Sequence, residues 1–156
     1  MKNYTLIAVF FLPFVFIFNA QAQQAKIKND IGYVDGQAYC EWVRLNMANE
    51  ATIRALNAEQ EEIYVAYRNY TDPVEVSKSN PEGKVRWMEV YFPCFDLRCE
   101  VENRSHKGLL KLFYQNNLYV EGKLNRENVE RFVKKFGMRF SENRRNGNVN
   151  IIIHNN

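Results

Sequence analysis

The spacing of apolar side chains changes from every second residue to every third or fourth within residues 95–113, which read FDLRCEVENRSHKGLLKLF. Apolar and charged residues alternate over residues 95–102, and this period of two indicates a strand that buries one face. The apolar residues of 109–113 have helical spacing instead, and Ser105 stands where an N-cap belongs. A strand followed by an amphipathic helix predicts an α+β fold in which the helix packs on a sheet.

Upstream of this stretch the chain has the pattern of further strands. Runs of β-branched and aromatic residues between turn residues indicate an antiparallel sheet of about five or six strands. The expected strands cover residues 31–34, 38–45, 51–56, 62–70, 85–92 and 95–102. Residues 58–67 have a second interpretation, because their first three residues favour helix, whereas the β-branched and aromatic residues that follow favour strand.

Downstream, a second helix is expected between Asn125 and Gly137. Asn125 is a suitable N-cap, the apolar residues that follow recur at i, i+3, i+4 and i+7, and Gly137 is placed to end the helix. The apolar stripe must be buried, so we expect both helices to pack on one face of the sheet. Residues 149–154 are β-prone and are expected to form a closing edge strand or an end without regular structure.

The N-terminus has the order of a secretory signal peptide. A cationic start is followed by an apolar run and a small-x-small site, so we expect residues 1–22 to be removed after Ala22. An uncleaved anchor is the alternative, but the apolar run is shorter than the roughly 20 residues of a spanning helix. Residues 23–156 then form one globular domain, periplasmic or secreted, with no membrane span.

The charge of the chain is close to balanced. Its formal net charge is +3 over 156 residues, and both signs are interspersed along the sequence. This pattern is typical of a soluble surface, and the positive excess is too small to indicate a nucleic-acid partner. We therefore expect no nucleic-acid binding.

Three cysteines, Cys40, Cys94 and Cys99, are present in a chain expected outside the cytoplasm. One disulfide and one thiol is the simplest arrangement. A bridge from Cys94 to Cys99 would need a turn where the alternation predicts an extended strand. A disulfide is therefore expected to join Cys40 to Cys99; a bridge from Cys40 to Cys94 and three reduced thiols are the alternatives.

The order of these segments resembles a group of proteins. A signal peptide with a Gln-rich end, then Lys26-Ile27, then Val34-Asp35-Gly36, strands and the helix from Asn125 are similar to small uncharacterised secreted proteins common in Bacteroidota. The resemblance implies a bacterial protein outside the cytoplasm. It implies no activity and no catalytic residues.

Residue types that commonly serve in catalysis or metal binding are scarce or unsuitably spaced. The chain has two histidines, and His106 is expected to cap a helix or to face solvent. Asp96, Glu100 and Glu102 are expected on the solvated face of their strand. Metal-ligand spacings and phosphate-binding glycine loops are absent from the sequence, so no catalytic, cofactor or metal residues are predicted.

Aromatic residues are the feature that suggests a function. Tyr64, Arg68 and Tyr70 share one face of the expected strand 62–70. Exposed aromatic rings on a sheet can stack on sugars or anchor a protein partner. The leading hypothesis is a non-catalytic binding module for an envelope protein or a glycan. The alternatives are a hydrolase assembled from distant residues and a secreted inhibitor that uses the loop Ser77–Gly83.

Overall fold

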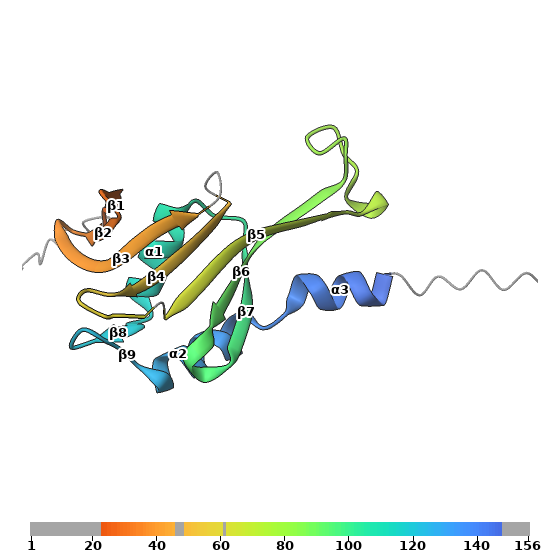
Figure 1. Cartoon of the computed structure of the whole chain (residues 1–156). Helices are drawn as coiled ribbons and strands as arrows, with labels where there is room; N and C mark the ends of the chain where they lie inside the picture. The colour runs from red at the N-terminus through yellow and green to blue at the C-terminus, as the bar shows by residue number, and fades with distance from the viewer. Residues whose placement is uncertain (1–22, 46–48, 61, 148–156) are drawn as a thin grey trace, which may run out of the picture.

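Seven strands form one antiparallel sheet, and their order in the sheet is their order in the chain (Figure 1). The structure is a computed structural model that describes residues 23–45, 49–60 and 62–147, and the seven strands belong to this part of the chain. The strands are β1 (Ala25–Lys28), β2 (Ile31–Val34), β3 (Gln37–Leu45), β4 (Glu50–Ala55), β5 (Ile63–Thr71), β6 (Lys84–Phe92) and β7 (Leu97–Glu102).

The α+β prediction is confirmed, with seven strands in place of about five or six. The strand at the N-terminal edge, β1, was not anticipated, although Ala25 and Ile27 alternate with two lysines in its four residues. The helical interpretation of residues 58–67 is wrong, because β5 begins at Ile63 and pairs with β4 over residues 63–66 and with β6 over residues 64–71.

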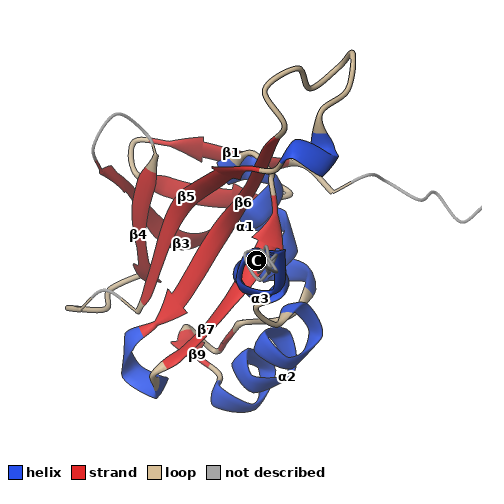
Figure 2. Ribbon diagram, turned by 90° about the vertical axis from the view of Figure 1, so that its right-hand side faces the viewer, coloured by secondary structure: helices blue, strands red, loops and turns tan. Residues whose placement is uncertain are grey.

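Two helices cover one face of the sheet, as the sequence predicts (Figure 2). Helix α1 (His106–Gln115) packs against β1 and β2, and α2 (Arg126–Phe136) packs against β7. A small hairpin of β8 (Tyr119–Val120) and β9 (Lys123–Leu124) connects them. We call the helix-covered side of the sheet the inner face and the opposite side the outer face.

The helix boundaries follow from capping side chains. Ser105 Oγ accepts a hydrogen bond from the backbone N–H of Gly108, and Asn125 Oδ1 accepts one from that of Asn128. Gly137 ends α2 with φ at +61°, a conformation that glycine adopts without strain. Both N-caps and the glycine stop were predicted from the sequence.

The core lies between the inner face and the two helices. Phe132 of α2 is 1% exposed and contacts the rings of Phe92, Phe113 and Phe136, with centroid distances of 6.2, 5.7 and 4.7 Å. The other large side chains buried in this core include Trp42, Ile53, Ile63, Met88, Leu109, Leu110 and Leu118. The helix stripe read from the sequence therefore packs on the sheet, as expected.

A third helix, α3 (Arg139–Gly147), reaches the outer face beside β6 and β7. Its Phe140 stacks on Trp87, with centroids 5.7 Å apart and planes 10° from parallel. Its first turn donates to Glu100, which is only 1% exposed. The prediction that Glu100 is solvated is wrong, because a helix N-terminus has unpaired N–H groups that a carboxylate satisfies.

Some predictions concern residues outside the described part of the chain. The signal peptide, residues 1–22, and the closing strand, residues 149–154, are among them. Within the described residues, none of the helices is both long enough and apolar enough to cross a bilayer.

Candidate functional site

Tyr64, Arg68 and Tyr70 lie at alternate positions of β5 and share its outer face, as predicted. Ile63 and Val65, which alternate with them along the strand and point to the inner face, are buried in the core. Tyr64 and Tyr70 are half-buried, and the side chain of Arg68 is 41% exposed. The strand thus presents two tyrosines and one arginine on the side that α1 and α2 leave uncovered.

A second tyrosine lies beside Tyr64. Tyr91 of β6 is the register partner of Tyr64, which places their Cβ atoms about 5 Å apart. The guanidinium carbon of Arg98 lies 5.1 Å from the Tyr91 ring centroid, and the Tyr91 hydroxyl donates to Asp96 at 3.2 Å. Tyr91 was not among the predicted site residues, although the alternation of strand 85–92 places it on one face with Trp87 and Glu89.

Charged groups surround this tyrosine pair. Arg68 lies between two glutamates, 3.9 Å from Glu50 and 3.6 Å from Glu89. The residue between these glutamates in register, Ala66, is fully buried. A hydrogen bond to the Glu50 carboxylate raises the pKa of the Tyr64 hydroxyl, with a smaller effect of burial. Tyr64, Glu50, Arg68 and Glu89 therefore form one connected group, which we call the outer-face cluster.

Tyr70 lies apart from this cluster. It contacts Trp87 edge to face, with ring centroids 5.7 Å apart, and Trp87 is in turn covered by Phe140 of α3. Trp87 is 5% exposed, and its indole N–H has no hydrogen-bond acceptor within the described part of the chain. The structure thus brings Arg68 to Tyr64 but places Tyr70 in the aromatic contact that holds α3.

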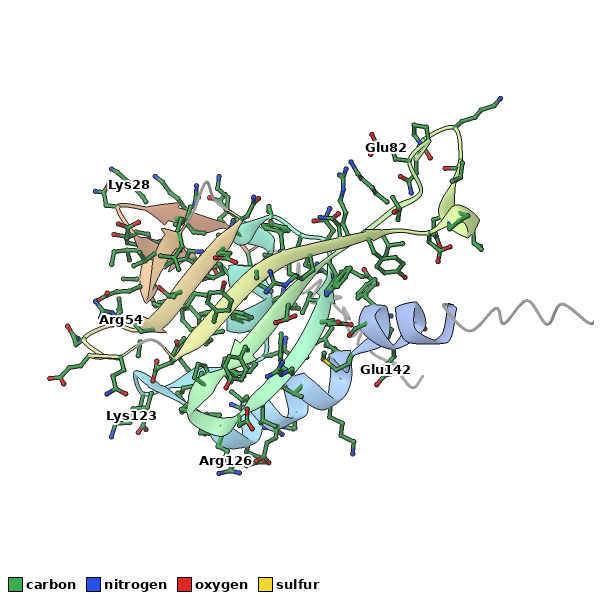
Figure 3. All side chains as sticks on the ribbon, turned by 45° about the vertical axis from the view of Figure 1, so that its right-hand side comes forward. Lys28, Arg54, Glu82, Lys123, Arg126 and Glu142 are labelled. Atoms are coloured by element: carbon green, nitrogen blue, oxygen red, sulfur yellow. The ribbon has the colours of Figure 1, made fainter. Side chains whose placement is uncertain are left out.

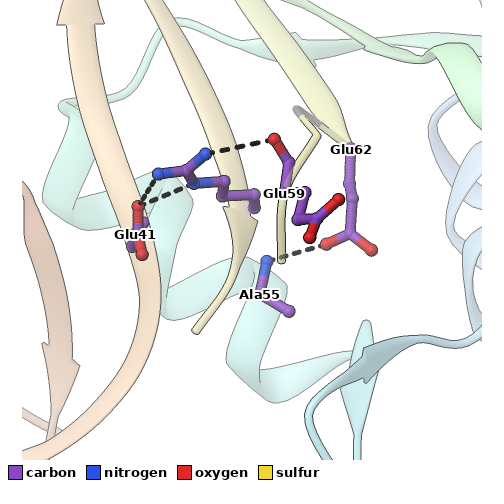
Figure 4. A network of polar contacts seen from close by, with 5 residues as sticks. Glu41, Ala55, Glu59 and Glu62 are labelled. Atoms are coloured by element: carbon purple, nitrogen blue, oxygen red, sulfur yellow. Dashed lines mark hydrogen bonds and ion pairs between the residues drawn. The ribbon is translucent and has the colours of Figure 1, made fainter. Parts of the chain in front are cut away.

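At the end of the outer face near the β4–β5 hairpin, the polar side chains bind one another (Figure 4). Arg54 contacts the Glu41 carboxylate at 2.6 and 2.7 Å and donates to the Glu59 carbonyl at 3.4 Å. The Glu62 carboxylate accepts from the backbone N–H of Ala55 at 2.7 Å. These groups close the hairpin, so the outer-face cluster is the better candidate for external contacts.

The groups that carry chemistry in many enzymes are buried in this protein. His106 is 9% exposed, and its Nδ1 accepts a hydrogen bond from Trp42 Nε1 at 3.2 Å. The expectation that His106 caps a helix or faces solvent is therefore wrong: Ser105 is the cap, and the ring faces the core. Among the described residues, no three of the types His, Cys, Asp and Glu are placed to hold a metal ion.

The three cysteines are free thiols. Burial raises the pKa of Cys40 and of Cys99 to about 12, and Cys94 is exposed. The Cys40–Cys99 disulfide is not formed, because β3 and β7 are separated by three strands. Neighbouring strands lie about 4.8 Å apart, so the four spacings from β3 to β7 add up to roughly 19 Å. A disulfide joins Cα atoms that are only about 4.4–6.8 Å apart.

Comparisons with known proteins add no relative. No protein-family model, no curated protein and no solved structure matches the chain. The resemblance to secreted Bacteroidota proteins therefore stays a prediction. A function for the chain has to be argued from its own side chains.

Proposed function

We propose that this protein is a non-catalytic binding module that acts outside the cytoplasm and binds a neutral glycan on its outer sheet face. The observation that carries the proposal is the pair Tyr64 and Tyr91, which lie side by side next to a connected group of charged side chains. Tyrosine rings offer apolar faces for sugar rings and a hydroxyl for hydrogen bonds.

The charges on this face favour an uncharged ligand. Three glutamates, Glu41, Glu50 and Glu89, are matched by three arginines, Arg54, Arg68 and Arg98, on the same face of neighbouring strands. The two further glutamates of this face already have partners, since Glu100 accepts from the first turn of α3 and Glu102 pairs with Arg139. A polyanion such as nucleic acid would gain little attraction from this balance. A polyhydroxylated ligand, in contrast, finds both acceptors and donors beside the tyrosine rings.

The polar groups are also held in place before a ligand arrives. Arg68 contacts both Glu50 and Glu89, and Tyr64 is hydrogen-bonded to Glu50. Side chains ordered in the free protein lose less conformational entropy on binding, which favours affinity. A sheet supplies a firmer support for such a group than a loop does.

The test is a titration with soluble neutral oligosaccharides of glucose, xylose, mannose and N-acetylglucosamine, followed by NMR and calorimetry. We expect binding to at least one of them, with shifts at Tyr64 and Tyr91. Tyr64→Ala and Tyr91→Ala should each weaken it about tenfold or more, since a stacking ring at the centre of a contact contributes over 1 kcal/mol.

The matched control is Tyr33→Ala, which removes a half-buried tyrosine from β2 and should leave affinity unchanged. Binding to none of the oligosaccharides, or equal affinity of the Tyr64 and Tyr91 variants, would contradict the proposal. Shortening of the oligosaccharide during the titration would support the hydrolase alternative instead.

The location outside the cytoplasm is supported by the signal pattern of residues 1–22. The expected mature N-terminus is Gln23, and N-terminal sequencing of exported protein checks it. A mature protein that retains Met1 would contradict cleavage and support the membrane-anchor alternative.

A further inference from the structure

The hairpin between β5 and β6 continues well beyond the sheet. The last register pair is Thr71 with Lys84, and residues 72–83 form a projection that we call the arm (Figure 1). Hairpins close with two to five residues, and longer connections with an internal structure often carry function. The arm is therefore more than a turn.

The arm is folded by its own hydrogen bonds. Asn80 is at its centre: its side chain accepts from the Lys84 N–H at 3.0 Å and donates to the carbonyls of Glu75 and Lys84, both at 3.2 Å. At its base, the Asp72 N–H donates to the Gly83 carbonyl at 2.8 Å. Such a loop presents a fixed surface to a partner.

The surface of the arm is apolar and acidic. Val74 is 87% exposed and Val76 is 55% exposed; among the described residues the other large exposed apolar side chain is Val120. Three carboxylates, of Asp72, Glu75 and Glu82, and one ammonium group, of Lys78, give the arm a formal charge of −2. Glu75, between the two valines, makes no ion pair with any residue that the structure describes.

A surface of the opposite charge lies at the other edge of the sheet. A depression of about 350 Å³ on the β1–β2 hairpin is lined by Gln24, Lys26, Lys28, Tyr33 and Gly36. Both lysines are exposed, and neither has an ion-pair partner within residues 23–45, 49–60 and 62–147. We call this surface the basic depression; lysine stems and a tyrosine ring give it apolar walls as well as positive charge.

We propose that the arm of one molecule docks into the basic depression of a second copy of this chain. The two valines would pack on Tyr33 and on the lysine stems, and Glu75 would face the two ammonium groups. An arm cannot reach the depression of its own chain, because Lys28 and Glu82 lie on opposite sides of the molecule (Figure 3). This assembly goes beyond glycan binding and does not depend on it.

The contact is head-to-tail, since it joins two different surfaces. Each molecule keeps a free arm or a free depression after the first contact, so further copies can add. Two valines and a few charges bury little area, and interfaces of that kind are weak. The expected behaviour is self-association that grows with concentration and weakens with salt.

Sedimentation equilibrium over a wide concentration range tests the proposal. The wild-type protein should self-associate, whereas Val74→Ser/Val76→Ser and Lys26→Glu/Lys28→Glu should each sediment as a monomer. An equimolar mixture of the two variants should form a dimer, because the first retains the depression and the second retains the arm. This dimer should not add further copies, because its remaining arm and its remaining depression are the mutated ones.

Two control variants keep the changes matched. Val120→Ser removes an exposed valine elsewhere, and Lys134→Glu/Lys135→Glu reverses two exposed lysines on α2; both should associate like the wild type. A wild-type protein that stays monomeric at every concentration would overturn the proposal. So would association that persists in either docking variant, or a mixture of the variants that stays monomeric.

Discussion

Three hydrogen bonds converge on the carboxylate of Glu100. The backbone N–H groups of Phe140 and Ser141 donate to it at 2.6 and 3.0 Å, and the Ser141 hydroxyl donates as well. A buried carboxylate is costly unless its lone pairs are satisfied, and here the first turn of α3 satisfies them. The same bonds complete the N-terminus of α3, so one residue of β7 decides where this helix begins.

Glu100→Gln should loosen α3 without unfolding the sheet. The amide keeps an acceptor oxygen for the two backbone N–H groups but loses the negative charge, and hydrogen bonds to a charged group at a helix N-terminus are stronger than neutral ones by about 1–2 kcal/mol. Amide hydrogen exchange of Phe140 and Ser141 should then accelerate roughly fivefold to thirtyfold.

The matched control for this change is Glu102→Gln, two residues along the same strand. Glu102 is 63% exposed and pairs with Arg139 at 3.2 Å. Exposed ion pairs contribute about 0–1 kcal/mol, so exchange at α3 should change little. Equal exchange rates in the Glu100 variant and the wild type would show that α3 is held by Phe140 alone.

The buried thiols of Cys40 and Cys99 predict a loss of stability in alkaline solution. Burial raises the pKa of each from 9.0 to about 12. As pH rises above about 9 the unfolded chain releases these protons while the folded chain retains them, so the free energy of unfolding falls. The slope approaches about 1.4 kcal/mol per pH unit for each thiol.

Urea unfolding between pH 8 and pH 11 measures this slope, which should be shallower in Cys40→Ala/Cys99→Ala. Burial also raises the pKa values of Tyr39 and Tyr119, which adds the same downward trend to both proteins. Burial raises the pKa of the exposed Cys94 thiol as well, so Cys94→Ala should make the slope shallower, but by less than the double variant does. Identical slopes for the double variant and the wild type would contradict the burial effect.

At the scale of elements, the regular part of the fold could be predicted from the sequence. The alternation in β7, the stripe of α2 and its Asn125 cap depend on neighbours along the chain, which the sequence displays. Helix α3 could not be found in this way, because its charged residues form no apolar stripe and its anchor, Glu100, comes from a distant strand.

Only part of the candidate site could be predicted from the sequence. The alternation of β5 placed Tyr64 and Arg68 on one face, whereas their partners Tyr91 and Glu89 depend on the register of β5 with β6. That register is fixed by the arm between the two strands, whose hydrogen bonds centre on Asn80. His106 was misplaced for a similar reason, since its acceptor role depends on Trp42, far away in the sequence.

Two glycines allow a matched test of the arm. Both have positive φ, +60° at Gly83 and +82° at Gly36, so alanine is strained at each. A Cβ at Gly83 would lie 2.3 Å from the Asp72 carbonyl oxygen, whereas a Cβ at Gly36 meets nothing within 4 Å. Gly83→Ala should therefore open the base of the arm, and Gly36→Ala should cost only about 1 kcal/mol.

Limited proteolysis measures the effect on the arm. Cleavage after Lys78 should become much faster in Gly83→Ala and should stay at the wild-type rate in Gly36→Ala. Equal cleavage rates in the two variants would mean that the hydrogen bonds of Asn80 keep the arm folded even when the contact between Asp72 and Gly83 is lost.

At the scale of the whole molecule, stability depends on the contact between the inner face and α2. Phe132→Ala removes a ring that touches three other phenylalanines and should cost about 3–5 kcal/mol. Small domains have about 5–15 kcal/mol in total, so the melting temperature should fall steeply. Lys134→Ala, on the exposed side of α2, should change stability by about 0.5 kcal/mol or less. A neutral Phe132 variant would contradict the core described above.

The order of the sheet also allows the strands to assemble in a stepwise order during folding. Each strand from β2 to β7 pairs with the strand just before it in the chain, so the hairpins can close one after another as the chain emerges with its N-terminus first. The helices that cover the inner face come only after the seventh strand, from residue 106 onward. Until they arrive, a nearly complete sheet exposes its apolar side, and this is the stage at which the folding chain is most exposed to aggregation and most dependent on chaperones.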